Sequence, residues 1–262
     1  MPFQSTSVPL QVLKAHWQTW VLSILNQNTG GLLGGLVHNL HNHAHTLSMQ
    51  AEMWEHSLSK APDAPASSLQ RSFQRIQTLS SEFSGECRTL SERTHLQSFE
   101  PALLPVHNTL EWLKKFWVHN LFFKHHVQFM IQQDKQVPQA VTLPPAPFVF
   151  CLEEGLKNAL EALPPEAAHT GQPSPLHLDI LMTSSGMDFE LTSPTSLTTS
   201  LDPWQPGVSS KTGHLGLGLP LLWICCEHMG WQCDLQGDPK STTLRLVIPA
   251  DRPGQPVPAG RL

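Results

Sequence analysis

The sequence lacks any cluster of basic residues. Its 262 residues carry a net charge of −5, and charged residues make up only 14% of the chain. Proteins that bind nucleic acid attract the phosphate backbone through gathered Lys and Arg side chains. We therefore expect no nucleic-acid partner.

Long hydrophobic runs are also missing. The longest, from Leu215 to Cys226, is interrupted by Gly216, Gly218 and Pro220, and it is shorter than the roughly 20 residues that a membrane span needs. The first ten residues have neither a positive start nor an apolar core, so they do not form a signal peptide. We expect a cytoplasmic protein without a membrane attachment.

Cysteines are few and follow no motif. The five cysteines form no C-x-x-C pair and are odd in number, which favours reduced thiols over a disulfide framework. We interpret them as packing residues.

A chain of this length supports two domains, each with its own core.

The first hundred residues contain the pattern of amphipathic helices. Apolar residues recur in alternating three- and four-residue steps, the spacing of a helix in a bundle, at Leu33, Leu36, Leu40, Ala44, Leu47, Ala51, Trp54 and Leu58. A second series follows a turn over residues 61–68, at Leu69, Phe73, Ile76, Leu79, Phe83, Cys87 and Leu90. We predict helix from Leu10 to Leu58, broken at Thr29-Gly30-Gly31, and an antiparallel hairpin with the second helix.

Two apolar seams cannot bury themselves in one hairpin. A homodimer that closes a four-helix bundle is one solution. Alternatively, the leading helix or a later helix around Leu110, Leu113, Trp117 and Leu121 covers the seam within one chain.

The pattern changes to a period of two after Phe123. Four segments alternate apolar and polar residues as strands do, around Val127 to Ile131, Leu176 to Met182, Met187 to Leu191 and Leu244 to Ile248. Two more helical segments lie between them, Pro147 to Leu163 and Gly218 to Met229. These elements predict an α+β fold with mainly antiparallel strands, followed by a disordered tail over residues 251–262.

His38 is the leading candidate for chemistry. At roughly 100° per residue it lies about 200° around the helix from Leu36, so it should face solvent. His41, Asn42 and His45 share this outward sector, whereas His43 turns back toward the packed side. A single exposed histidine is often only a solvated residue. His41 and His45 also have the spacing of metal ligands, but no nearby carboxylate or thiol completes a set.

Two further segments suggest a ligand site. Glu154 and Asn158 lie one turn apart on one side of a helix, where both can meet one ligand. The alternating glycines Gly213, Gly216 and Gly218 open another helix, which permits backbone approach to phosphates. Each feature has a structural explanation as well: Glu154 as a solvated helix acid, and the glycines as a tight turn.

Together these segments resemble the two-component sensor histidine kinases, over nearly the whole chain. The run Gly35-Leu36-Val37-His38-Asn39-Leu40-His41-Asn42 looks like the phosphoacceptor box, and Glu154 to Ala159 looks like the N box. The resemblance implies a dimerisation and phosphoacceptor domain over residues 1–100 and a Bergerat-type ATPase domain over residues 101–250. It assigns Mg²⁺ coordination to Asn158, a general-base position to Glu154, and nucleotide contacts to Lys211, Gly213, Gly216 and Gly218.

Two departures from the family pattern change the expected activity. The adenine-reading aspartate and glycines of the first glycine box are replaced by Leu191-Thr192-Ser193-Pro194-Thr195-Ser196-Leu197, so ATP binding should be weak or absent. Asn39 replaces the acid that follows the phosphoacceptor histidine, which weakens autokinase chemistry. Asn42 keeps the position that orients groups beside the histidine.

The sequence therefore predicts histidine phosphotransfer between His38 and a response-regulator receiver domain, with Asn39 and Asn42 beside the reacting group. No cofactor is certain, and Mg·ATP would serve only with a functional nucleotide site. Two alternatives remain. One is an active kinase that uses Asn158, Lys211 and the glycines; the other is a scaffold that binds a receiver without chemistry.

Overall fold

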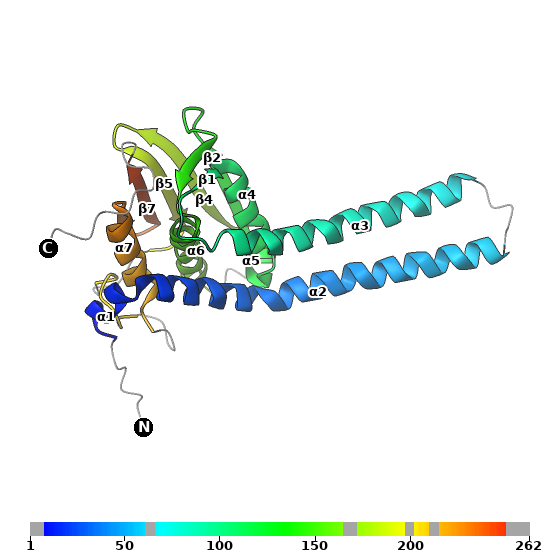
Figure 1. Cartoon of the computed structure of the whole chain (residues 1–262), viewed down its shortest axis with the longest axis horizontal. Helices are drawn as coiled ribbons and strands as arrows, with labels where there is room; N and C mark the ends of the chain where they lie inside the picture. Colours follow the sequence, from blue (N-terminus) through cyan, green and yellow to red (C-terminus); the bar gives the residue numbers. More distant parts are fainter. Residues whose placement is uncertain (1–7, 61–65, 165–171, 197–201, 210–214, 250–262) are drawn as a thin grey trace, which may run out of the picture.

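A long helical hairpin projects from an α/β sandwich in the computed structural model of this chain (Figure 1). The structure describes residues 8–60, 66–164, 172–196, 202–209 and 215–249. The α+β fold class predicted from sequence is confirmed. The helices are α1 (Leu10–Ala15), α2 (Trp17–Lys60), α3 (Ala66–His95), α4 (Val106–Trp117), α5 (Leu121–His126), α6 (Pro145–Ala162) and α7 (Gly218–Met229). The strands are β1 (Ala102–Pro105), β2 (Val127–Gln133), β3 (Ala140–Leu143), β4 (Ser174–Thr183), β5 (Gly186–Ser193), β6 (Gln232–Gly237) and β7 (Thr242–Pro249).

The main sheet has five strands in the order β2-β4-β5-β7-β6. Only its first pair, β2 and β4, runs parallel; the other neighbours are antiparallel. In the register of β5 and β7, Phe189 lies opposite Leu246 and Leu191 opposite Leu244, so the apolar residues of both strands share one face. Arg245 emerges on the opposite face, where it pairs with Asp188 and Glu190.

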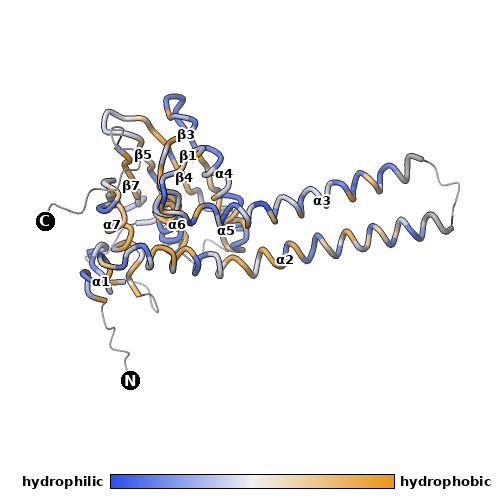
Figure 2. The backbone as a smooth tube through the Cα atoms, viewed as in Figure 1, coloured by the Kyte–Doolittle hydropathy of each residue, from blue (hydrophilic) through white to orange (hydrophobic). Residues whose placement is uncertain are grey.

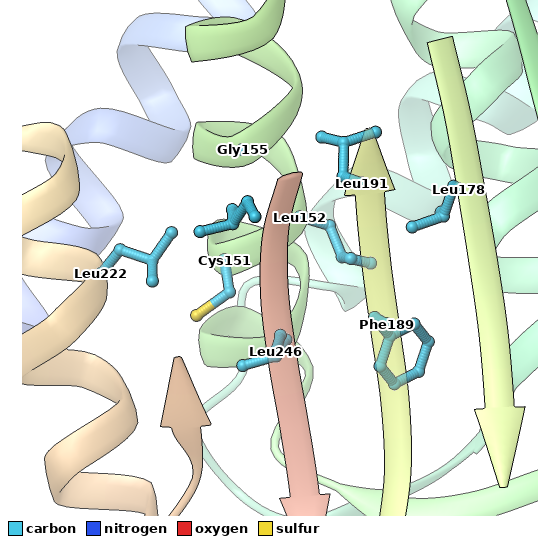
Figure 3. A pocket seen from close by; sticks show the side chains of 9 residues that line it. Cys151, Leu152, Gly155, Leu178, Phe189, Leu191, Leu222 and Leu246 are labelled. Carbon is cyan, nitrogen blue, oxygen red and sulfur yellow. The ribbon is translucent and has the colours of Figure 1, made fainter. Parts of the chain in front are cut away.

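Helices α6 and α7 cover the apolar face of this sheet. Cys151 and Leu152 of α6 point toward Phe189, Leu191 and Leu246 around a void of only about 10 Å³ (Figure 3). A Cβ at Gly155 would lie 2.6 Å from a methyl carbon of Leu244. A side chain at position 155 would therefore displace the side chain of Leu244, and the void enclosed by these residues is too small for a ligand.

The first half of α2 forms a further layer on α6 and α7. Leu13 of α1 and Val21, Leu25 and Leu32 of α2 are buried in the same hydrophobic core as the sandwich. The small sheet of β1 and β3 and the N-terminus of α4 complete this body.

The predicted break at Thr29-Gly30-Gly31 is wrong. Helix α2 runs unbroken for 44 residues through all four glycines between positions 30 and 35, and the chain instead breaks at His16, between α1 and α2. Packing overrides the low helix propensity of glycine here, because the buried side chains on both sides of the segment hold it against the rest of the protein.

Beyond the sandwich, the described residues of α2 and α3 pack on each other. Figure 2 shows hydrophobic residues recurring along α2 and α3 rather than forming a continuous run, and among the described helices none has the length and hydropathy that a membrane crossing requires. No described side chain between residues 37 and 88 is buried. Trp112 of α4 donates to the Thr89 carbonyl oxygen of α3, so the later helices cover only the base of the hairpin.

Candidate functional site

His38 projects into solvent from the middle of α2. Its neighbours on the same sector, His41, Asn42 and His45, are also exposed. His43 is half-buried and its Nδ1 lies 3.6 Å from a carboxylate oxygen of Glu82 on α3. The orientation of these side chains, as predicted from the helical period, is confirmed.

Asn42 holds the ring of His38. Its Nδ2 lies 3.0 Å from Nε2 of His38, at the i to i+4 spacing that brings side chains together on a helix surface. An amide nitrogen only donates hydrogen bonds, so Nε2 is the unprotonated nitrogen that carries the lone pair. Nε2 is therefore the nitrogen of His38 that can act as a nucleophile.

Asn39 is directed elsewhere. Its Nδ2 lies 3.3 Å from Nδ1 of His119, in the turn between α4 and α5. The side chain that follows the phosphoacceptor candidate thus contacts the sandwich instead of the imidazole of His38.

A second candidate site is an open cavity of about 880 Å³ between α2, α6, the start of α7 and the ends of β5 and β7. The structure places Glu154, Asn158, Gly216 and Gly218 around this one cavity. Lys211 and Gly213 lie outside the described residues, as does the tail over residues 251–262. Another part of the wall was not predicted from sequence: α2 contributes Trp20, Ser23, Ile24 and Gln27.

The side of this cavity next to the start of α7 contains a carboxyl group. Glu154 is buried, and one of its oxygens would lie 2.2 Å from a Cβ added at Gly218, the first residue of α7. The Glu154 side chain thus lies beside the start of α7, although no side chain makes a capping hydrogen bond at the N-cap residue Leu217. Asn158 donates from Nδ2 to the Glu154 carbonyl oxygen, at 2.7 Å, so its amide group is turned onto its own helix.

Burial raises the pKa of Glu154, and Lys157 and Asn28 oppose this shift. The Lys157 ammonium lies 3.8 Å from Glu154 Oε1, while the Asn28 amide donates to the same oxygen at 3.5 Å. Glu154 is therefore a structural element of the cavity wall and not a solvated helix acid.

The other end of the cavity is lined by hydroxyl groups. Ser193 at the end of β5 and Thr195 just beyond it belong to the segment Leu191 to Leu197, and their hydroxyl oxygens are 2.7 Å apart. Thr242 donates from its hydroxyl to the Thr195 carbonyl oxygen at 2.6 Å. These groups satisfy one another, and no carboxylate is available among them to accept from an adenine amino group.

Sequence reasoning missed a buried ionic cluster that joins the hairpin to the cavity wall. Arg93 of α3 makes a bidentate pair with Glu153 of α6, at 2.5 and 3.0 Å, and it also donates to Thr29 and to the Leu25 carbonyl oxygen of α2. Asn28 donates to Glu153 Oε2 at 3.1 Å. Burial raises the pKa of Glu153, with Arg93 acting in the opposite direction. The available signal was an acid, Glu153, directly after the apolar run Phe148 to Leu152.

Metal ligands do not gather in the described part of the chain, where no group of three or more His, Cys, Asp or Glu side chains is arranged to hold an ion. Cys151 and Cys226 bring their sulfur atoms to 3.9 Å, and burial raises the pKa of the Cys151 thiol. These cysteines are protonated packing residues.

No protein-family model and no curated protein sequence matches this chain. Solved structures with a similar arrangement include the histidine kinase AdeS of Acinetobacter baumannii, at 13% identity and a TM-score of 0.46 over 78% of this chain and 97% of that one. The histidine kinase domain of the blue-light-activated kinase of Erythrobacter litoralis gives 15% identity and a TM-score of 0.46 over 80% and 97%. A bacterial phosphotransferase gives 9% identity and a TM-score of 0.40 over 84% and 95%. These similarities are too distant to assign a family.

Proposed function

We propose that this protein is a histidine phosphotransfer protein of a two-component system, which exchanges a phosphoryl group between His38 and an aspartate of a response-regulator receiver domain. One observation carries the proposal: an exposed imidazole on a helical hairpin, with Asn42 fixing Nε2 as the nitrogen that bears the lone pair.

The transfer needs few protein groups. Nε2 of His38 attacks the phosphorus of the aspartyl phosphate, and the N–P bond forms as the P–O bond to the carboxylate breaks. The carboxylate leaves with the electron pair, and the proton on Nδ1 passes to solvent. Because an acyl phosphate is already activated, an exposed and neutral imidazole is a sufficient nucleophile. Asn42 orients the ring and is displaced by the incoming phosphoryl group.

The cavity supports phosphotransfer over kinase activity. We expect a nucleoside triphosphate to bind weakly there, because the hydroxyls of Ser193 and Thr195 offer no carboxylate to accept from an adenine amino group. The cavity is also remote from His38. Gln27 is its last contributor from α2, and His38 lies 11 residues further along, which is about 16 Å at about 1.5 Å per residue. Reacting atoms must approach to about 3–3.5 Å.

We further propose that the active form is a homodimer in the cytoplasm. The apolar residues of α2 and α3 remain half-exposed in one chain, and a second hairpin would bury them in a four-helix bundle.

The test uses the purified protein and a panel of receiver domains phosphorylated with acetyl phosphate. His38→Gln should abolish phosphoryl uptake while shifting the free energy of unfolding by less than ~0.5 kcal/mol, because the position faces solvent. His41→Gln and His45→Gln are matched controls on the same sector and should keep most of the transfer.

Two other outcomes would select the alternatives. Labelling by Mg·ATP together with low-micromolar, adenine-selective binding in calorimetry would establish a kinase. A protein that binds a receiver but takes up phosphate from neither donor would be a scaffold.

A further inference from the structure

His119 lies where the sandwich meets both helices of the hairpin. It is in the turn between α4 and α5, and it is only 4% exposed. Its Nδ1 lies 3.3 Å from Nδ2 of Asn39 on α2, and its Nε2 lies 3.1 Å from Oε2 of Glu86 on α3. One ring therefore contacts both helices at the level of His38.

The main chain of His119 contacts α2 as well. A Cβ added at Gly35 would lie 2.1 Å from the carbonyl oxygen of His119, so the two backbones touch and only glycine is accommodated. Gly35 and Asn39 are one helical turn apart and lie on either side of His38 in the sequence. His38 projects about 100° away from Asn39 around the helix, so the contact leaves it accessible.

The two ring nitrogens of His119 differ in their contacts. Nδ1 is within hydrogen-bond distance of the Asn39 amide nitrogen, whereas Nε2 lies close to the Glu86 carboxylate without making a well-aligned hydrogen bond. Burial lowers the pKa of His119, Glu86 opposes this shift, and Lys124 of α5 adds to it. Burial therefore favours the neutral ring at this position.

We propose that His119 is a positioning residue for phosphoryl exchange at His38. Its contacts at Gly35 and Asn39 fix the rotation of α2 about its axis, and thereby the direction in which His38 and Asn42 present the reactive nitrogen. This role rests on the proposed phosphotransfer function. It also explains why the residue after His38 is an amide: Asn39 serves the contact with His119 and does not act on the phosphoryl group.

Two substitutions separate positioning from simple space filling. His119→Asn keeps an amide near the place of Nδ1 and retains the partner of Asn39, whereas His119→Gln reaches toward Glu86 and loses that partner. We expect His119→Asn to keep the initial rate of phosphoryl exchange within about twofold, and His119→Gln to slow it by about tenfold or more, because small misplacements of a reacting group are costly. His107→Gln, at an exposed position on α4, should leave the rate unchanged.

A second variant avoids the buried position. Asn39→Ala removes the same hydrogen bond from the α2 side and should slow exchange as His119→Gln does, with no further loss in the double variant. Equal rates for His119→Asn and His119→Gln, whether both normal or both slow, would overturn the proposal.

Amide hydrogen exchange distinguishes this proposal from the function on which it rests. Residues 32–42 should exchange faster in His119→Gln than in the wild type, because α2 is released from the sandwich. A wild type that accepts no phosphoryl group would refute the function and, with it, the positioning role; the hydrogen exchange would then show only whether the contact holds the helix. Unchanged exchange in His119→Gln would overturn the proposal even if phosphotransfer is found.

Discussion

Arg93 connects α3 of the hairpin to α6 of the sandwich and to α2. Its guanidinium is buried, shares both oxygens of Glu153 and lies 5.0 Å from the ring centre of Phe116. Removing one partner of a buried pair leaves an uncompensated charge away from water. We expect Arg93→Met to lower the free energy of unfolding by about 3–5 kcal/mol, measured by urea denaturation at a single protein concentration.

The exposed pair of Lys14 and Glu227, at 2.8 Å, is the matched control. Lys14→Met should change stability by no more than about 1 kcal/mol, because an exposed pair gains little. The double variant Arg93→Met with Glu153→Leu should recover much of the loss, since no charge is then left buried. A loss as small as that of Lys14→Met would show that water reaches the Arg93 pair.

Some properties of single residues can be predicted from the sequence and others cannot. The exposure of His38 follows from helical period alone, because neighbours along a helix determine it. The partners of Asn39 and Glu153 do not, because His119 and Arg93 are 80 and 60 positions away. Nothing in the sequence distinguishes Gly35, which the His119 backbone approaches, from Gly31 and Gly34, which meet nothing within 4 Å.

At the scale of elements, the glycines of α2 provide a comparison within one helix. A Cβ at Gly31 would meet nothing within 4 Å, whereas a Cβ at Gly35 would meet the His119 carbonyl group. Gly31→Ala should therefore raise the free energy of unfolding by about 1 kcal/mol, the propensity difference between the residues. Gly35→Ala should lower it despite the same gain in propensity.

Thermal or urea denaturation of the two variants checks this prediction, with circular dichroism to confirm that the helix content is retained. A stabilised Gly35→Ala variant would mean that α2 can move away from the turn at His119. That result would also weaken the role proposed for His119.

The elements predicted from sequence are those with strong periodicity. All four strands with alternating apolar residues form, as β2, β4, β5 and β7, and α7 begins and ends at the predicted residues. Three strands were missed: β1 and β3 have only four residues each, and β6 is an edge strand with no buried side chain. Short and edge strands bury too little apolar surface to leave a pattern.

At the scale of the whole molecule, the hairpin is the part whose apolar residues a single chain leaves exposed. Leu33 of α2 is 45% exposed and Phe73 of α3 is 50% exposed, and the sandwich covers only the base of the two helices. Apolar surface of this kind is normally buried against another bundle element. The fold of one chain therefore predicts a second copy on the hairpin.

We expect the wild type to be a dimer in light scattering at tens of micromolar, roughly the range in which a stable dimer stays assembled. Phe73→Glu should dissociate it, because a carboxylate in the apolar centre of a bundle must be desolvated without a partner. Leu103→Glu is the control: Leu103 lies on β1, outside the hairpin, and is 71% exposed, so this variant should remain dimeric. A wild type that is monomeric at this concentration would show that α2 and α3 are not a dimer interface, and so would a Phe73→Glu variant that remains a dimer. The exposed apolar residues of the hairpin would then be available for the receiver domain to cover.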